Sequence, residues 1–250
     1  MQLRILHDTL YTYTTPVENA QHVAHLQPSS SATQTVHSFA LSIDPEPTAL
    51  HTHTDAFGNV MSHWTLHQAH QRLHVRASSQ IHTQVLSAPE PASLLANWES
   101  VREQFRYRAG QSTDLNSQFV FASHHAPIDE AFAQFARPAF APERSLVEAA
   151  ISLMQSIYQG FTYASQSTDI HTPALQALQE RRGVCQDFAH ILIACLRSLG
   201  LPACYLSGYL LTHPPEGQKR LVGSDASHAW AAVYVPAAHE HASGGWLHLD

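Results

Sequence analysis

Three residues that lie far apart in the sequence have side chains that together suit nucleophilic catalysis. Cys185 follows a glycine turn and opens an apolar stretch typical of a helix. A thiol at the first turn of a helix faces the positive end of the helix dipole, which favours the thiolate that attacks carbonyl carbon. His228 stands between a polar loop and an apolar strand, and Asp250 closes a short segment that begins at Trp246. These are the residue types of a nucleophile, its general base and an orienting carboxylate.

Each of these side chains also fits a purely structural role. A free cysteine is most often a small buried apolar residue. His228 is one of 20 histidines, and Asp250 also fits a surface carboxylate. Cys195 lies deep in the predicted helix and Cys204 at the start of a strand, so neither gains from a helix N-terminus and we expect both to be structural. Among the cysteines, Cys185 is therefore the candidate nucleophile.

The composition narrows the class of protein. The 250 residues suffice for one large domain or two small ones, and 44% are hydrophobic, enough for a sizeable core. A net charge of −7 with only 13 Lys and Arg argues against a nucleic-acid partner. No apolar run reaches about 18 residues, and the N-terminus lacks the apolar core of a signal peptide. Three cysteines without a Cys-x-x-Cys pair favour reduced thiols. We therefore expect a cytoplasmic protein with no membrane partner.

Histidine is unusually frequent in the first hundred residues. A dense histidine tract can bind metal. Alternatively, strand faces rich in Thr, Ser and Gln accept histidine as a neutral polar side chain. No cysteine or carboxylate is spaced with these histidines as in a zinc site, which favours the second interpretation. We expect no metal and no cofactor, and a metal-content measurement on the purified protein would test the alternative.

Residues 1–86 have the pattern of a β domain. The segment Leu3–Tyr13 is rich in β-forming residues, and Val36–Ile43 alternates between apolar and polar side chains. A turn follows at Asp55–Asn59, where glycine and asparagine tolerate positive φ. Several short strands at this spacing predict an antiparallel, sandwich-like domain.

The remainder divides into a connection and a core. Residues 87–142 combine a proline-containing linker with a helical connection. Residues 143–250 carry clear helical patterns followed by strands, which indicates an α+β core rather than an alternating parallel sheet. Ser145 is the expected N-cap of one helix, with Glu148 completing a capping box. A second helix, Ala174–Glu180, has Pro173 at its first turn, and a third helix from about Cys185 to Leu199 ends at a glycine followed by a proline.

Several motifs together resemble the bacterial transglutaminase-like superfamily, of the transglutaminase-like cysteine protease type. The C-terminal motifs are Gly183–His190, Leu196–Ala203, Ser207-Gly208-Tyr209, His228-Ala229-Trp230 and Gly245–Asp250. The N-terminal β region of that family is matched by Tyr13, Pro16-Val17, Leu26, Pro28, Asp55 and Phe57-Gly58-Asn59. The likeness spans most of the chain and is weakest over about residues 88–140.

This resemblance implies a papain-like core in which helices pack on an antiparallel sheet. It assigns Cys185 as nucleophile, His228 as base and Asp250 as the orienting group. The implied chemistry is acyl transfer from a peptide or isopeptide amide of a protein or peptide substrate through a thioester, with hydrolysis favoured over cross-linking. The Cys185 backbone N–H is a natural oxyanion donor, and Tyr163 and Gln186 are candidates for the rest of the pocket.

Two questions remain open from the sequence. Similar proteins continue past the aspartate with Pro-Thr and a strand-rich tail, so we expect that the catalytic core is truncated at Asp250, either in a fragment or in a naturally short protein. The alternative to an enzyme is a non-catalytic partner-binding module that keeps the same fold and docks through its N-terminal β region. In that case Cys185→Ala would leave the biological effect intact.

Overall fold

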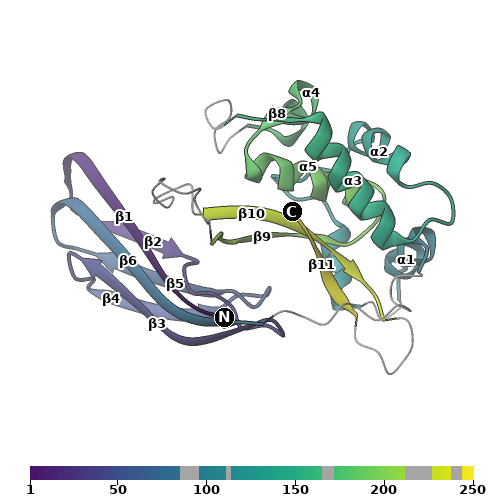
Figure 1. Cartoon of the computed structure of the whole chain (residues 1–250). Coiled ribbons are helices and arrows are strands. Elements are labelled where there is room, and N and C mark those ends of the chain that lie inside the picture. The colour runs from purple at the N-terminus through teal and green to yellow at the C-terminus, as the bar shows by residue number, and fades with distance from the viewer. Residues whose placement is uncertain (85–95, 111–113, 165–171, 212–226, 238–243) are drawn as a thin grey trace, which may run out of the picture. The chain divides into compact units, whose positions relative to one another are not determined.

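The computed structural model describes residues 1–84, 96–110, 114–164, 172–211, 227–237 and 244–250 (Figure 1). The chain divides into two compact units, Met1–Ala88 and Pro89–Asp250. None of the helices in these ranges has the length and apolar character needed to cross a membrane.

The N-terminal unit consists of two three-stranded antiparallel sheets. One has the order β1-β6-β3 and the other β2-β5-β4. Their bounds are β1 (Gln2–Val17), β2 (Ala20–Ala24), β3 (Gln34–Asp44), β4 (Ala49–Thr54), β5 (Val60–Leu66) and β6 (His70–Thr83). Both sheets contribute to one small core formed by Ile43, Trp64, Leu66, Leu73 and Val75. The predicted sandwich-like domain is thereby confirmed.

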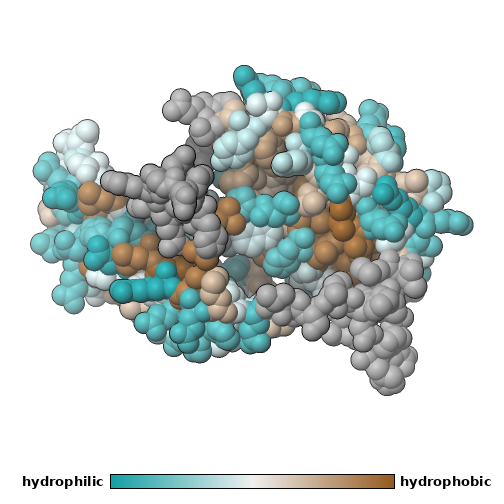
Figure 2. All heavy atoms as spheres, in the orientation of Figure 1, coloured by the Kyte–Doolittle hydropathy of each residue, from teal (hydrophilic) through white to brown (hydrophobic). Residues whose placement is uncertain are grey.

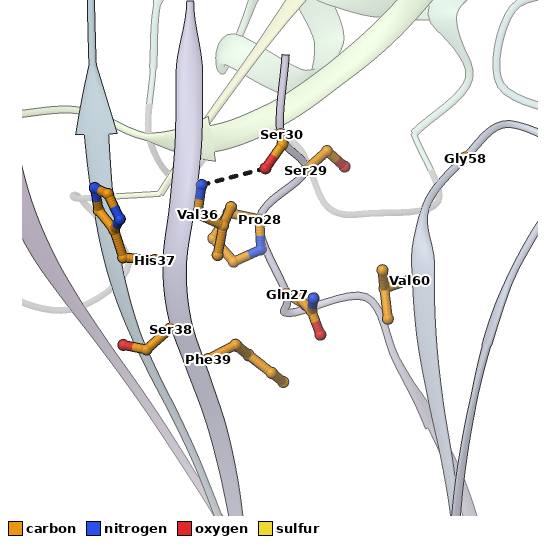
Figure 3. Close-up of a pocket in the computed structure, with 10 residues that line it drawn as sticks. All are labelled: Gln27, Pro28, Ser29, Ser30, Val36, His37, Ser38, Phe39, Gly58 and Val60. Carbon is orange, nitrogen blue, oxygen red and sulfur yellow. Dashed lines mark hydrogen bonds between the residues drawn. The ribbon is translucent and has the colours of Figure 1, made fainter.

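The core of this unit does not fill the whole space between its sheets. The pairing of β3 with β6 shifts between Val36 and Ser38, as in a β-bulge, which breaks the strict alternation of apolar residues along β3. Val36, Phe39 and Val60 line an open hollow of about 460 Å³ (Figure 3). On its rim the Ser30 hydroxyl accepts a hydrogen bond from the Val36 N–H at 3.2 Å. Figure 2 also shows hydrophobic patches on the visible face of this unit.

The C-terminal unit combines helices with a three-stranded antiparallel sheet of order β11-β10-β9 and a short parallel pair, β7-β8. Its helical elements are α1 (Trp98–Phe105), η2 (Leu115–Val120), α2 (Glu130–Ala136), η3 (Arg137–Ala139), α3 (Leu146–Gly160), α4 (Ala174–Glu180) and α5 (Cys185–Ser198). Its strands are β7 (Thr162–Tyr163), β8 (Arg182–Gly183), β9 (Ala203–Tyr209), β10 (Ser227–Val235) and β11 (Gly245–Leu249). Helices packed on an antiparallel sheet confirm the α+β prediction.

Helix α5 is the centre of this unit, because it packs against β10 and β9 on one side and against α2, α4 and α3 elsewhere (Figure 1). Its apolar stripe is almost fully buried: Ile191, Ala194 and Leu196 are each 0% exposed. Burying an isoleucine or leucine side chain contributes about 1.5–3 kcal/mol, so this stripe anchors the helix firmly. The helix is followed by Gly200, whose φ of 79° suits a glycine stop.

The predicted capping box of α3 is wrong. Ser145 occupies the N-cap position, but its side chain makes no capping hydrogen bond. Instead, Ser145 pairs with Asn97 in an isolated β-bridge, and the Leu146 N–H donates to the Ala96 carbonyl at 2.9 Å. A backbone acceptor from a distant segment thus satisfies a helix N-terminal amide that local sequence reasoning assigned to a side chain.

Candidate active site

Cys185 is the first residue of α5, and the turn before it is tightly built. Asp187 is only 2% exposed, and its Oδ2 accepts a hydrogen bond from the Val184 N–H at 2.8 Å. A Cβ atom at Gly183 would lie 2.6 Å from that same Oδ2, so only glycine fits there. The carboxylate therefore fixes the start of the helix and leaves the cysteine at the end of the helix where the dipole is positive.

His228 and Asp250 are joined directly. His228 lies in β10, and its Nε2 is 2.6 Å from Oδ1 of Asp250, which follows the last residue of β11. The histidine side chain is 16% exposed and the aspartate side chain 53%. Because a carboxylate accepts, Nε2 carries the proton, and in the neutral ring Nδ1 is the nitrogen that can accept a proton. The contact thus sets the tautomer that a general base requires.

Contacts along α5 show that the helix runs in the same direction as β10. The His190 ring lies 5.1 Å from the Tyr205 ring, and further along the helix the Arg197 guanidinium donates to the Ala203 carbonyl at 3.0 and 2.8 Å. The register of the sheet pairs Tyr205 with Ala231 and Ala203 with Val233. Later positions of the helix therefore lie beside later positions of β10.

This direction places Cys185 at the same end of the sheet as His228. The helix rises about 7.5 Å from His190 back to Cys185, and the strand covers about 10 Å from Ala231 back to His228. Between the two side chains, the described part of the chain contains no thiol–imidazole hydrogen bond. Such bonds are often long before substrate binds and tighten in the reacting complex.

The other two cysteines differ from Cys185 in their surroundings. Cys195 is 0% exposed, and burial raises the pKa of its thiol far above the ordinary value. Burial raises the pKa of the Cys204 thiol to about 12. Cys185 is only partly buried. Both of the other thiols are therefore held in the protonated, unreactive form.

The two predicted pocket residues lie close to the start of α5. Tyr163 pairs with Gly183 across β7 and β8, is 65% exposed, and its ring centre is 6.4 Å from that of Phe188. Gln186 is the second residue of α5. The first amides of a helix have no carbonyl partner within it, so the N–H groups of Cys185 and Gln186 are available in principle to an oxyanion.

A group of rings near α5 was not predicted from the sequence. His190 stacks between His125, at 5.0 Å and 7°, and Tyr205. Burial, and secondarily the charge of His125, lowers the pKa of His190 to about 4, although Asp187 acts in the opposite direction. The three rings come from segments about 65 and 15 residues apart, so no local signal could have found them.

Some histidines of the N-terminal strands stack on one another in pairs. His51 faces His63 across β4 and β5, and the rings of His53 and His63 stack at 4.7 Å. His74 instead bonds Asp8 at 2.7 Å. Throughout the ranges that the structure covers, no three or more His, Cys, Asp or Glu side chains are grouped so that they could hold a metal ion.

The fold and the site define a class of α+β proteins built around a cysteine that begins a helix, with a His–Asp pair on the adjoining sheet. Residues 3–82 match the family described as the bacterial transglutaminase-like N-terminal region, and residues 133–250 match the transglutaminase-like superfamily. The chain is 38% identical over 253 residues to uncharacterized proteins of Mycobacterium tuberculosis and Mycobacterium bovis, covering 99% of this chain and 77% of each relative. The chain belongs to the transglutaminase-like superfamily.

Two further comparisons extend this result. An uncharacterized protein of Mycobacterium leprae is 28% identical over 252 residues, covering 100% of this chain and 82% of that protein. The crystal structure of a "putative cysteine protease" from Cytophaga hutchinsonii superposes with a TM-score of 0.71 at 20% identity, covering 100% of this chain and 76% of the other. At this identity the likeness establishes the fold alone.

Proposed function

We propose that the protein is a cysteine-dependent acyl-transfer enzyme that acts on peptide or isopeptide amides of protein or peptide substrates. In this proposal Cys185 is the nucleophile, His228 the general base and Asp250 the group that orients the imidazole. The observation that carries the proposal is the 2.6 Å contact between His228 Nε2 and Asp250 Oδ1, because it leaves Nδ1 as the proton acceptor at the end of the sheet where α5 begins.

The proposed reaction has two halves. His228 Nδ1 takes the proton of the Cys185 thiol, and the thiolate attacks the amide carbonyl. The tetrahedral intermediate collapses as the imidazolium returns the proton to the leaving amine, which leaves a thioester on Cys185. Attack by water then releases a carboxylic acid, whereas attack by a second amine forms a new amide. The Cys185 N–H, at the positive end of the helix, is suited to stabilise the oxyanion.

We propose hydrolysis rather than cross-linking as the main outcome. The resemblance to the transglutaminase-like cysteine protease type favours this choice, and the fold neighbour from Cytophaga hutchinsonii is named a "putative cysteine protease". A peptide substrate incubated with a fluorescent primary amine distinguishes the two outcomes. Hydrolysis predicts shortened peptides that carry free carboxylates, and predominant incorporation of the amine would reverse the choice.

Selective alkylation tests the nucleophile without knowledge of the substrate. With iodoacetamide at pH 7, mass spectrometry should show Cys185 labelled much faster than Cys195 and Cys204, because burial keeps those two thiols protonated. His228→Ala should slow the labelling of Cys185 and leave the other two unchanged. Equal, slow labelling of all three cysteines in the unmodified protein would refute the proposal.

A further inference from the structure

We infer that Trp230 and His248 are positioning residues that hold the His228 ring in the plane its role as base requires. This inference rests on the proposed function, since the base being positioned is the one proposed above. Neither residue touches the reacting atoms in this scheme, so both act through His228.

The contacts form a short chain across the sheet. The Trp230 indole stacks on the His228 ring, with centroids 5.9 Å apart and planes inclined by 21°. Its Nε1–H donates a hydrogen bond to Nδ1 of His248 at 3.2 Å. Partial burial lowers the pKa of His248, which keeps the ring neutral and Nδ1 able to accept. The indole is thus held at its polar edge while its face meets the base.

A glycine in the neighbouring strand leaves space for this indole. Gly208 of β9 pairs with His228, and a Cβ atom at Gly208 would lie 2.8 Å from Cη2 of Trp230. Any larger residue there would displace the indole, since contacts under 3 Å do not persist. The indole is therefore bounded by Gly208 at its six-membered ring, by His248 at its nitrogen and by His228 against its face.

A second restraint is needed because Asp250 alone does not fix the imidazole. The hydrogen bond at Nε2 anchors one atom of the His228 ring, and the ring can still tilt about that point. The stacked indole restricts the tilt and so fixes the direction of Nδ1, where the thiol proton must arrive. A general base works only within hydrogen-bond reach and alignment of the proton it takes, so this restraint affects reactivity directly.

Two substitutions at position 248 separate the hydrogen bond from the bulk of the side chain. His248→Gln keeps an acceptor for the indole N–H, and His248→Phe keeps a flat ring but has no acceptor. At pH 7 we expect His248→Phe to slow iodoacetamide labelling of Cys185 about three- to tenfold, which corresponds to the net free energy of one hydrogen bond. The labelling rate of His248→Gln should stay within about twofold of the unmodified protein, because glutamine keeps the acceptor. His51→Phe, an exposed histidine of β4, is the matched control and should change nothing.

A spectroscopic readout makes the test independent of the thiol. In ¹H–¹⁵N spectra of the full chain, the indole N–H signal of Trp230 should shift in His248→Phe and return in His248→Gln. Trp230→Phe keeps an aromatic face and removes the donor. It should reproduce the labelling loss of His248→Phe, and the double variant should lose no more than either single one, because both remove the same hydrogen bond.

The outcomes are distinct. Unchanged labelling and an unchanged indole signal in His248→Phe would overturn the inference, as would equal losses in His248→Gln and His248→Phe, or fully additive losses in the double variant. If His248→Phe does not fold, Trp230→Phe decides by the same labelling criterion. If Cys185 of the unmodified protein is unreactive, the proposed function fails, while the indole spectrum still reports whether His248 holds Trp230.

Discussion

Removing the charge of Asp250 while keeping its shape tests the proposed triad most directly. Asp250→Asn still offers an oxygen to His228 Nε2 but no longer stabilises an imidazolium. In proteases with a fully buried orienting aspartate the same change costs about 10⁴ in rate. Here the aspartate side chain is 53% exposed, so water shares in solvating the charge and the effect must be smaller.

The expected loss in the labelling rate of Asp250→Asn follows from the exposure of the aspartate side chain. A hydrogen bond to a charged group contributes about 1.5–3 kcal/mol, and the half-exposed aspartate places this one near the lower end, at about 1.5–2 kcal/mol. This corresponds to a fall of about 10–30-fold in the rate at which iodoacetamide labels Cys185 at pH 7. The rate is measured by mass spectrometry under excess reagent, with Cys195 as an internal reference.

The chain supplies a matched control in its N-terminal unit. His74 Nε2 bonds Asp8 Oδ1 at 2.7 Å, nearly the same contact as that between His228 and Asp250. Asp8→Asn removes a charge from a histidine partner without involving the proposed site, so labelling of Cys185 should not change. Labelling of Asp250→Asn within twofold of the unmodified protein would refute the reasoning, and so would an equal loss in Asp8→Asn.

Three further predictions concern stability. Gly183→Ala places a Cβ atom 2.6 Å from Asp187 Oδ2 and should lower the free energy of unfolding, measured in urea, by about 1–3 kcal/mol. As a control, Gly245→Ala places a Cβ atom with no other atom within 4 Å and should change the free energy of unfolding by less than about 0.5 kcal/mol. Leu196→Ala, at a side chain with 0% exposure, should cost about 2–5 kcal/mol by the same measurement. The folded-state pKa of His190 is about 4 against an ordinary 6.5, so the unfolded chain takes up its proton first and stability falls as the pH drops from 6.5 towards 4. His190→Phe should show a smaller fall in the urea midpoint over this window, and an unchanged pH dependence would contradict the burial argument.

Local signals in the sequence sufficed for α4 and for the end of α5. The predicted helix Ala174–Glu180 coincides with α4, whose N-cap is Pro173, and the predicted end of α5 at a glycine lies within a residue of the observed end. Helix α1 was not predicted although it carries a usable signal: the Asn97 side chain accepts from the Ser100 N–H at 2.8 Å.

Strands β2 and β4 could not be predicted in the same way. The sequence of β2, AQHVA, does not alternate between apolar and polar residues, although its residues alternate between partly buried and exposed; in β4 every residue after the first is exposed. They are strands because both pair with β5, which lies between them. A central strand with one buried face can hold short polar neighbours through backbone hydrogen bonds alone, and such pairing leaves no trace in their own composition.

The same limit applies to the site, where the residue types could be named from the sequence itself but their pairing came only from the family resemblance. Ala231 of β10 faces Leu249 of β11, and this register alone makes Asp250 the diagonal neighbour of His228. A slip by one residue would turn Asp250 to the opposite face of the sheet. Trp230 and His248 stand in the same diagonal relation two residues away on each strand, so the register that gives the base its carboxylate also gives the indole its acceptor. The two contacts are therefore consequences of one strand pairing, and any change that shifts β11 against β10 must disrupt both together.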